Sequence, residues 1–64
     1  MNPNSSLIMQ FRRMAIEKGG KELQDMTVEE IKTTFKDEVL IQLAMQIQLT
    51  LNYQALIEAF NNES

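Results

Sequence analysis

The chain has 64 residues, of which 44% are hydrophobic, and its six basic and nine acidic side chains give a net charge of −3. This length allows one small domain at most, and the hydrophobic content argues against disorder along the whole chain. Cysteine and histidine are both absent, which excludes disulfides, zinc sites built on these residues, and catalysis by a thiol or an imidazole.

The charges are distributed unevenly along the chain. All six basic residues precede residue 37, where they are mixed with five acidic ones, while residues 37–64 hold four acidic residues and no basic one. Phosphate-binding domains concentrate basic residues on one face, so nucleic acid is not favoured as a partner.

The N-terminal residues lack the pattern of a signal peptide. The uncharged run over residues 39–57 contains amide side chains that disfavour a membrane span. We therefore expect a cytoplasmic protein.

The first helix is predicted to begin after a flexible tail over residues 1–5, with Ser5 or Ser6 as its N-cap. Apolar residues then recur at helical spacing; they are Leu7, Ile8, Phe11, Met14 and Ala15. Glycine reaches the left-handed backbone conformation at low cost, so the pair Gly19-Gly20 predicts the end of this helix. A single helical domain is expected over residues 6–61, with a frayed end at residues 62–64.

The second helix has the clearest local signal in the chain. A polar connector over residues 21–25, anchored by Leu23, precedes Thr27, which fits the N-cap of a capping box completed by Glu30. A hydrophobic staple between the residues flanking this cap, Met26 and Ile31, would fix the same boundary. The side of this helix expected to be buried carries Val28, Ile31 and Phe35.

Whether one helix or two follow Thr27 is left open by the sequence. An unbroken helix over residues 28–61 would be about 51 Å long at 1.5 Å per residue, which is too long for a compact monomer. Either the chain bends near residues 34–38, or a long helix packs against another copy. We favour the bend, because Asp37 and Glu38 suit a new helix start.

Most of the apolar mass lies near the C-terminus: residues 39–60 contain 15 of the 28 hydrophobic residues. One side of a helix here would carry Leu40, Leu43, Ala44, Ile47, Leu51 and Ala55. The opposite side would carry Met45, Leu49, Tyr53, Leu56 and Phe60, which are the predicted oligomer interface. A helix that is apolar on two sides must be covered on two sides, and the first two helices can cover only one.

Residues 46–54 also alternate between polar and apolar side chains, which is the period of a half-buried strand. No other segment reads as a strand that could pair with this one, and the surrounding residue types favour a helix. We favour a helix and keep the strand as the alternative.

No motif for a nucleotide or a metal is present. The pairs Glu29-Glu30 and Asp37-Glu38 are interpreted as helix N-terminal charges, so we expect no catalytic residue, no cofactor and no enzymatic activity. Arg12 and Arg13 form the only basic pair and are a possible partner contact. The uncharged amides of the last helix suggest an interface, whose core is depleted in charge; they are Gln42, Gln46, Gln48, Asn52 and Gln54.

These observations predict an all-α fold of two or three helices with a long apolar C-terminal helix, in an oligomeric helical bundle. The favoured function is a small homo-oligomeric protein–protein interaction module that acts as an adaptor, inhibitor or assembly factor. It is expected to bind itself, as a dimer, and an unidentified protein partner. The alternative is a small dimeric nucleic-acid-binding transcriptional regulator that uses the six basic residues. Three helices fit a helix-turn-helix, but the last helix offers no Arg or Lys to read bases.

Overall fold

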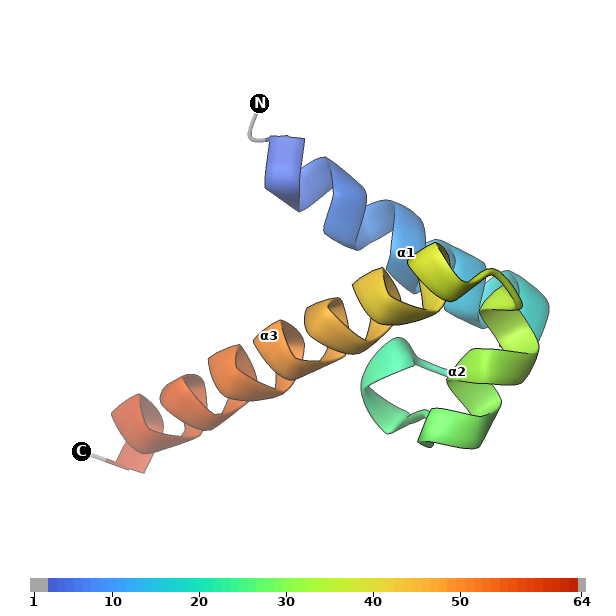
Figure 1. The fold of residues 1–64 in the computed structure, drawn as a ribbon. Helices are drawn as coiled ribbons and strands as arrows, with labels where there is room; N and C mark the ends of the chain where they lie inside the picture. Colours follow the sequence, from blue (N-terminus) through green and yellow to red (C-terminus); the bar gives the residue numbers. More distant parts are fainter. Residues whose placement is uncertain (1–2, 64) are drawn as a thin grey trace.

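The computed structural model describes residues 3–63, and the side-chain surroundings of residues 6–62. Three α-helices and one 3-10 turn follow one another (Figure 1): α1 is Pro3–Gly19, η1 is Leu23–Asp25, α2 is Val28–Phe35 and α3 is Glu38–Glu63. Residues 3–63 contain no strand. The predicted all-α fold is confirmed, and the alternating segment 46–54 is helical.

The outer ends of α1 and α3 differ from the prediction. Helix α1 begins at Pro3, so the predicted tail over residues 1–5 is too long, and neither Ser5 nor Ser6 is the N-cap. Proline suits the first position of a helix because its missing N–H would have no partner there. At the other end, α3 continues to Glu63, through two of the three residues predicted to fray. Residues 1, 2 and 64 lie outside the described part.

The end of α1 and the start of α2 lie where the sequence predicts them. Gly20 follows α1 with a φ of 69°, in the left-handed region. The Thr27 hydroxyl oxygen accepts from the Glu30 N–H at 3.2 Å, and the Thr27 N–H donates to Glu30 Oε1 at 2.9 Å. Both halves of the capping box are therefore formed. Met26 and Ile31, the residues of the predicted staple, are both buried.

The predicted bend between α2 and α3 is confirmed. Lys36 has a φ of 65°, which non-glycine residues rarely adopt, and its N–H donates to the Lys32 carbonyl at 3.0 Å. Asp37 Oδ1 then accepts from the N–H groups of Val39 at 2.9 Å and Leu40 at 3.2 Å. This side-chain cap supplies the start of α3 without a glycine or a proline.

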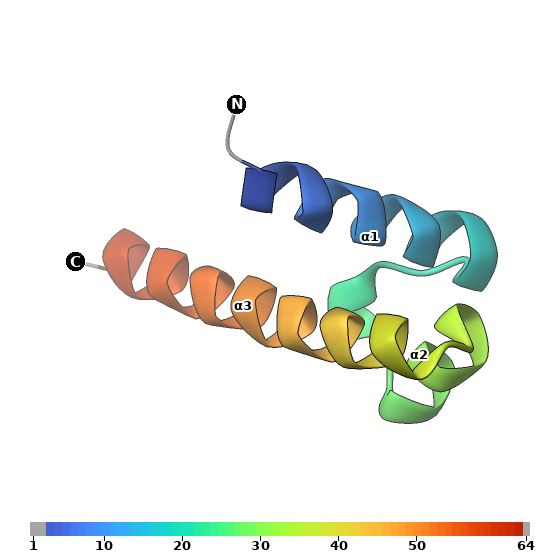
Figure 2. The same cartoon turned by 45° about the horizontal axis from the view of Figure 1, so that its top comes forward.

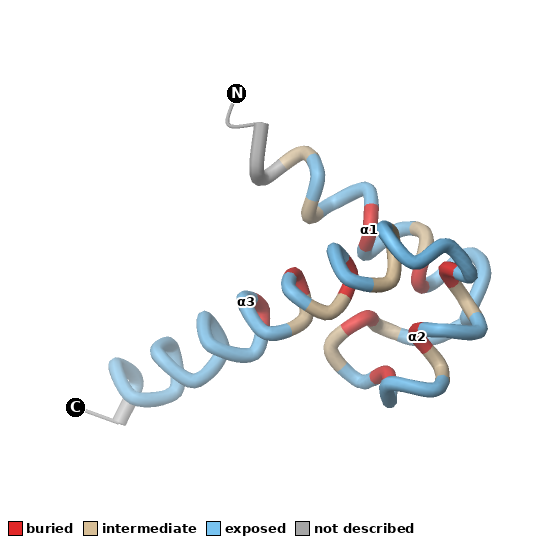
Figure 3. Tube along the Cα trace, viewed as in Figure 1, coloured by how far each residue is buried: buried red, intermediate tan, exposed pale blue. Residues whose placement is uncertain are grey.

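The core lies where the three helices and η1 meet, at the apex shown in red in Figure 3. The Phe11 and Phe35 rings stack with centroids 5.5 Å apart and join α1 to α2. Leu23, the predicted anchor of the connector, is completely buried. Every element contributes to the nine residues that are buried within residues 6–62: Phe11, Ala15, Leu23, Met26, Ile31, Phe35, Ala44, Ile47 and Leu51.

Four positions of the apolar stripes predicted to face the core are exposed: Leu7, Val28, Leu43 and Ala55. Val28, which is 49% exposed, lies in the first turn of α2, and helical side chains lean toward the N-terminus; its side chain therefore leans beyond the start of the helix. Ala55 is exposed because it lies past the last core residue of α3, Leu51. Leu43, at 37%, lies at the boundary of the same stripe.

Helices α1 and α3 diverge from the core in the view of Figure 1, and the view of Figure 2 shows the C-terminal part of α3 extending beyond α1. The longest dimension of the molecule is 41 Å, close to the length of α3 itself, about 39 Å at 1.5 Å per residue. Residues 52–62 are all exposed, so the second half of α3 projects beyond the core. Within residues 3–63, none of the helices combines the length and apolar character that crossing a bilayer requires.

Candidate interaction surface

One side of α3 carries large apolar side chains that no other part of residues 6–62 covers. Leu49 is 69% exposed, Tyr53 64%, Leu56 57% and Phe60 71%. Their spacing of three and four residues places them on one continuous stripe of the helix. We call these four residues the outer face of α3. All four belong to the predicted oligomer interface.

The core determines which side of α3 becomes the outer face. Ala44, Ile47 and Leu51 are buried against the other elements, so the opposite side points away from them. Met45, the fifth predicted interface residue, is partly buried and packs against the core of its own chain. It lies at the junction between the core and the outer face.

Two further large apolar residues of α3 that are exposed, Val39 and Ile57, fall in neither predicted stripe. Val39 is 67% exposed and Ile57 is 42% exposed. They are the first and last residues of the uncharged run over residues 39–57. The length of that run, rather than the helical spacing, is the sequence signal that could have identified them.

One of the amides predicted for an interface has a role inside the chain. Gln48 Nε2 donates to the carbonyl oxygens of Leu23 at 2.9 Å and Met26 at 2.6 Å. Gln24 Nε2 donates in return to the Leu51 carbonyl at 3.4 Å. These bonds tie η1 to α3. The other four amides of the set, Gln42, Gln46, Asn52 and Gln54, are exposed.

The predicted basic pair is divided between two environments on α1. Arg12 lies 3.7 Å from a carboxylate oxygen of Glu22, and both side chains are nearly half exposed. Arg13 is exposed, and among residues 6–62 no carboxylate pairs with it. The structure does not bring this pair to the outer face of α3, which belongs to another element.

Glu30 is held in its charged form. Its hydrogen bond with the Lys21 ammonium, 2.8 Å from Oε2, and then the bond from the Thr27 backbone N–H lower the pKa of Glu30 below its ordinary value of 4.5. A general acid near neutral pH needs a raised pKa. This carboxylate therefore serves the cap of α2 and does not supply a proton.

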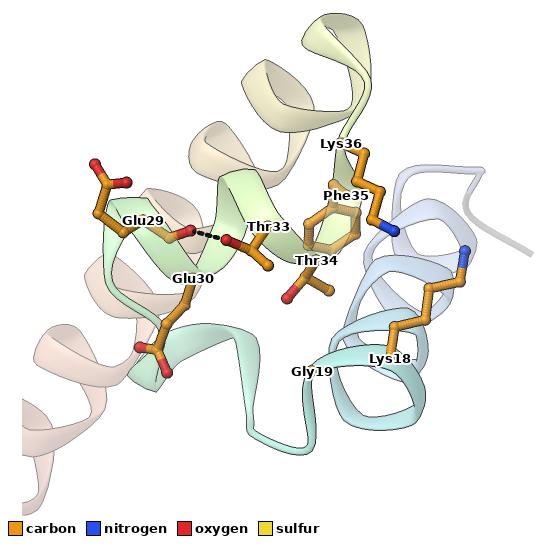
Figure 4. Close-up of a pocket in the computed structure, with 8 residues that line it drawn as sticks. All are labelled: Lys18, Gly19, Glu29, Glu30, Thr33, Thr34, Phe35 and Lys36. Atoms are coloured by element: carbon orange, nitrogen blue, oxygen red, sulfur yellow. Dashed lines mark hydrogen bonds between the residues drawn. The ribbon is translucent and has the colours of Figure 1, made fainter.

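A hollow of about 760 Å³ lies between the end of α1 and α2. Figure 4 shows Lys18 and Lys36 on one side of it and Glu29 and Glu30 on the other. A binding site for an anion or a cation would bring side chains of one charge close to a single point. In this hollow the lysines and the glutamates lie on opposite sides. It carries no functional assignment.

The outer face of α3 is the strongest candidate for a functional surface among the described residues. Residues 3–63 contain no group of three or more acidic, His or Cys side chains that could hold a metal ion. Comparison of the chain with protein-family models, with curated proteins and with solved structures gives no match in any of the three.

Proposed function

We propose that this chain is a small protein–protein interaction module that assembles with copies of itself through the outer face of α3 and acts by binding, as an adaptor, inhibitor or assembly factor. One observation carries the proposal: four large apolar side chains, each more than half exposed, lie on one helix face. Contiguous apolar patches of a few hundred Å² mark interaction sites. Tyr and Phe alone each carry roughly 150–250 Å² of surface.

Burial of the outer face favours self-association. Complete burial of one such side chain contributes about 1.5–3 kcal/mol, and each is already about one-third buried, so the gain grows with the number of outer-face side chains that a second copy covers. A chain of this size has a small core of its own, which a second copy would extend.

The nucleic-acid alternative draws less support from the same structure. Two of the six basic side chains are engaged by carboxylates, Arg12 by Glu22 and Lys21 by Glu30. Helix α3, the long exposed element, has no basic residue over its whole length. A DNA-reading helix would need donors such as Arg or Lys at base edges.

Light scattering and sedimentation equilibrium test the proposal, from micromolar to millimolar concentrations of the chain. We expect the wild type to form dimers, and Leu49→Glu to remain monomeric, because it places an unpaired charge in the interface. Leu49 is 69% exposed in a single copy, so the monomeric variant should keep its helical spectrum.

The matched control is Gln54→Glu. It adds the same charge to an exposed position of the same helix, away from the outer face, and should leave the dimer intact. A wild type that stays monomeric throughout, or a control that dissociates as fully as Leu49→Glu, contradicts the proposal.

A further inference from the structure

A hollow of about 550 Å³ lies between α2 and α3, at the N-terminal end of the outer face. Its apolar lining comes from Ile41 and Met45, which are partly buried. Met45 precedes Leu49 by one helical turn, so the hollow continues the stripe of the outer face. Six residues line it: Lys32, Lys36, Glu38, Ile41, Gln42 and Met45.

The two ends of the outer face have opposite charge. Two lysines and one glutamate line the hollow, and within residues 6–62 neither Lys32 nor Lys36 forms an ion pair. The far end of α3 includes Glu63, three residues beyond Phe60, and no basic residue. The carboxyl end of any helix is also negative, because its last carbonyls point outward along the axis. The two ends are complementary.

One copy cannot bring these two ends together. Helix α3 is continuous from Glu38 to Glu63, so about 33 Å of helix separates Phe60 from Glu38 at the edge of the hollow. The complementary ends can meet only between two chains.

We infer that the second copy docks antiparallel along α3; this inference rests on the self-association proposed above. The two-fold axis passes through the position of Leu49. The acidic end of each α3 then lies in the hollow of the other copy. Glu38 and Phe60 lie equally far from Leu49, about 16 Å along the helix on either side. Phe60 of each copy then meets the apolar lining of the hollow, close to Lys32 and Lys36. The arrangement is isologous and closed, as in most homodimers.

A parallel pairing lacks these contacts. It places the two acidic ends of α3 side by side, where like charges repel, and leaves both hollows unfilled. The antiparallel pairing gives each hollow an apolar side chain and opposite charge. It also sets a register in which Gln42 of one copy faces Leu56 of the other.

Cysteine cross-linking tests this register directly, because the chain has no cysteine of its own. Gln42→Cys and Leu56→Cys replace exposed residues and should leave the fold intact. We expect a disulfide dimer only when the two variants are mixed and oxidised. Leu49→Cys should cross-link to itself.

The single variants distinguish the two pairings. In the antiparallel dimer the two copies of position 42 lie about 21 Å apart along the helix axis, beyond the roughly 7 Å that a disulfide can span. Gln42→Cys that cross-links efficiently with itself, at the rate of Leu49→Cys, would show a parallel dimer and overturn the inference.

Charge reversal tests the contact between the hollow and the acidic end. The double variant Lys32→Glu/Lys36→Glu should weaken the dimer roughly tenfold at low salt. Glu63→Lys in the same chain, at the acidic end of α3, should restore part of the affinity. The control Arg13→Glu/Lys18→Glu makes the same charge change on α1 and should leave the dimer unchanged.

The outcomes separate this inference from the proposal on which it rests. The antiparallel arrangement is overturned if the dimer cross-links in parallel, or if its affinity is unchanged when the charges of Lys32 and Lys36 are reversed. Either result is still compatible with self-association. A wild type that is monomeric at every concentration overturns both.

Discussion

The clearest structural prediction concerns Gln48, whose side chain holds the connector between α1 and α2 against α3. Its Nε2 group donates to the carbonyls of Leu23 and Met26, at 2.9 and 2.6 Å, and both bonds are partly buried. Gln48→Leu keeps a side chain of similar size but removes the donor. The Met26 carbonyl oxygen then loses the Gln48 donor, and the Leu23 carbonyl oxygen keeps only the Met26 N–H, at 3.2 Å.

The expected loss is about 1–3 kcal/mol, because each hydrogen bond of this kind contributes about 0.5–1.5 kcal/mol net. A domain of this size has a total stability of roughly 3–10 kcal/mol at about 0.05–0.15 kcal/mol per residue. The substitution should therefore remove a sizeable fraction of the free energy of unfolding.

Urea unfolding followed by far-UV circular dichroism measures this loss, with all variants at one concentration because self-association adds to stability by mass action. The control is Gln46→Leu, which makes the same change at an exposed position of α3 and should stay within about 0.5 kcal/mol of the wild type. Hydrogen exchange at residues 23–26 should also accelerate in Gln48→Leu. Equal midpoints for Gln48→Leu, Gln46→Leu and the wild type would refute the role assigned to Gln48.

Three further predictions concern the helix contacts and the surface charges. Gly19→Ala should lower the melting temperature, since overpacking costs about 1–3 kcal/mol and the added Cβ would lie 2.8 Å from the hydroxyl oxygen of Thr34; an unchanged melting temperature would contradict this close approach. The pKa of Glu30 is lowered in the folded chain, so the contribution of Glu30 to folding stability is present above its ordinary pKa of 4.5 and is lost as the pH falls through its pKa in the folded chain. Acid titration of Glu30→Gln should therefore show a shallower loss of stability than the wild type. Identical curves would show that the charge of Glu30 does not stabilise the cap. Arg12→Ala with Arg13→Ala should change stability by no more than about 0.5 kcal/mol, because both side chains are exposed; a loss of several kcal/mol in urea would show that the pair is structurally engaged.

The sequence alone determined the features that depend on neighbouring residues. The capping box joins Thr27 to Glu30 three residues later, and the cap of α3 joins Asp37 to the two residues after Glu38. Gly20 ends α1 through its own backbone conformation. Such contacts form within one helical turn, so the residue types and their spacing are enough to predict them.

The stripe of the outer face could likewise be predicted, because helical spacing groups Leu49, Tyr53, Leu56 and Phe60 on one side wherever the helix lies. Spacing does not say which side the rest of the chain covers. The structure shows the side with Ala44 buried and the outer face exposed.

Only the tertiary structure decided what depends on contacts far apart in the chain. Gln48 reads in sequence as one of several surface amides, but its acceptors lie 22 and 25 residues away. Met45 shares a helical stripe with Leu49, yet its place beside the core buries part of it. Val28 follows a perfect cap and is still exposed. Burial and long-range hydrogen bonding depend on how whole helices pack. The local spacing of residue types does not determine which distant residue a side chain will contact.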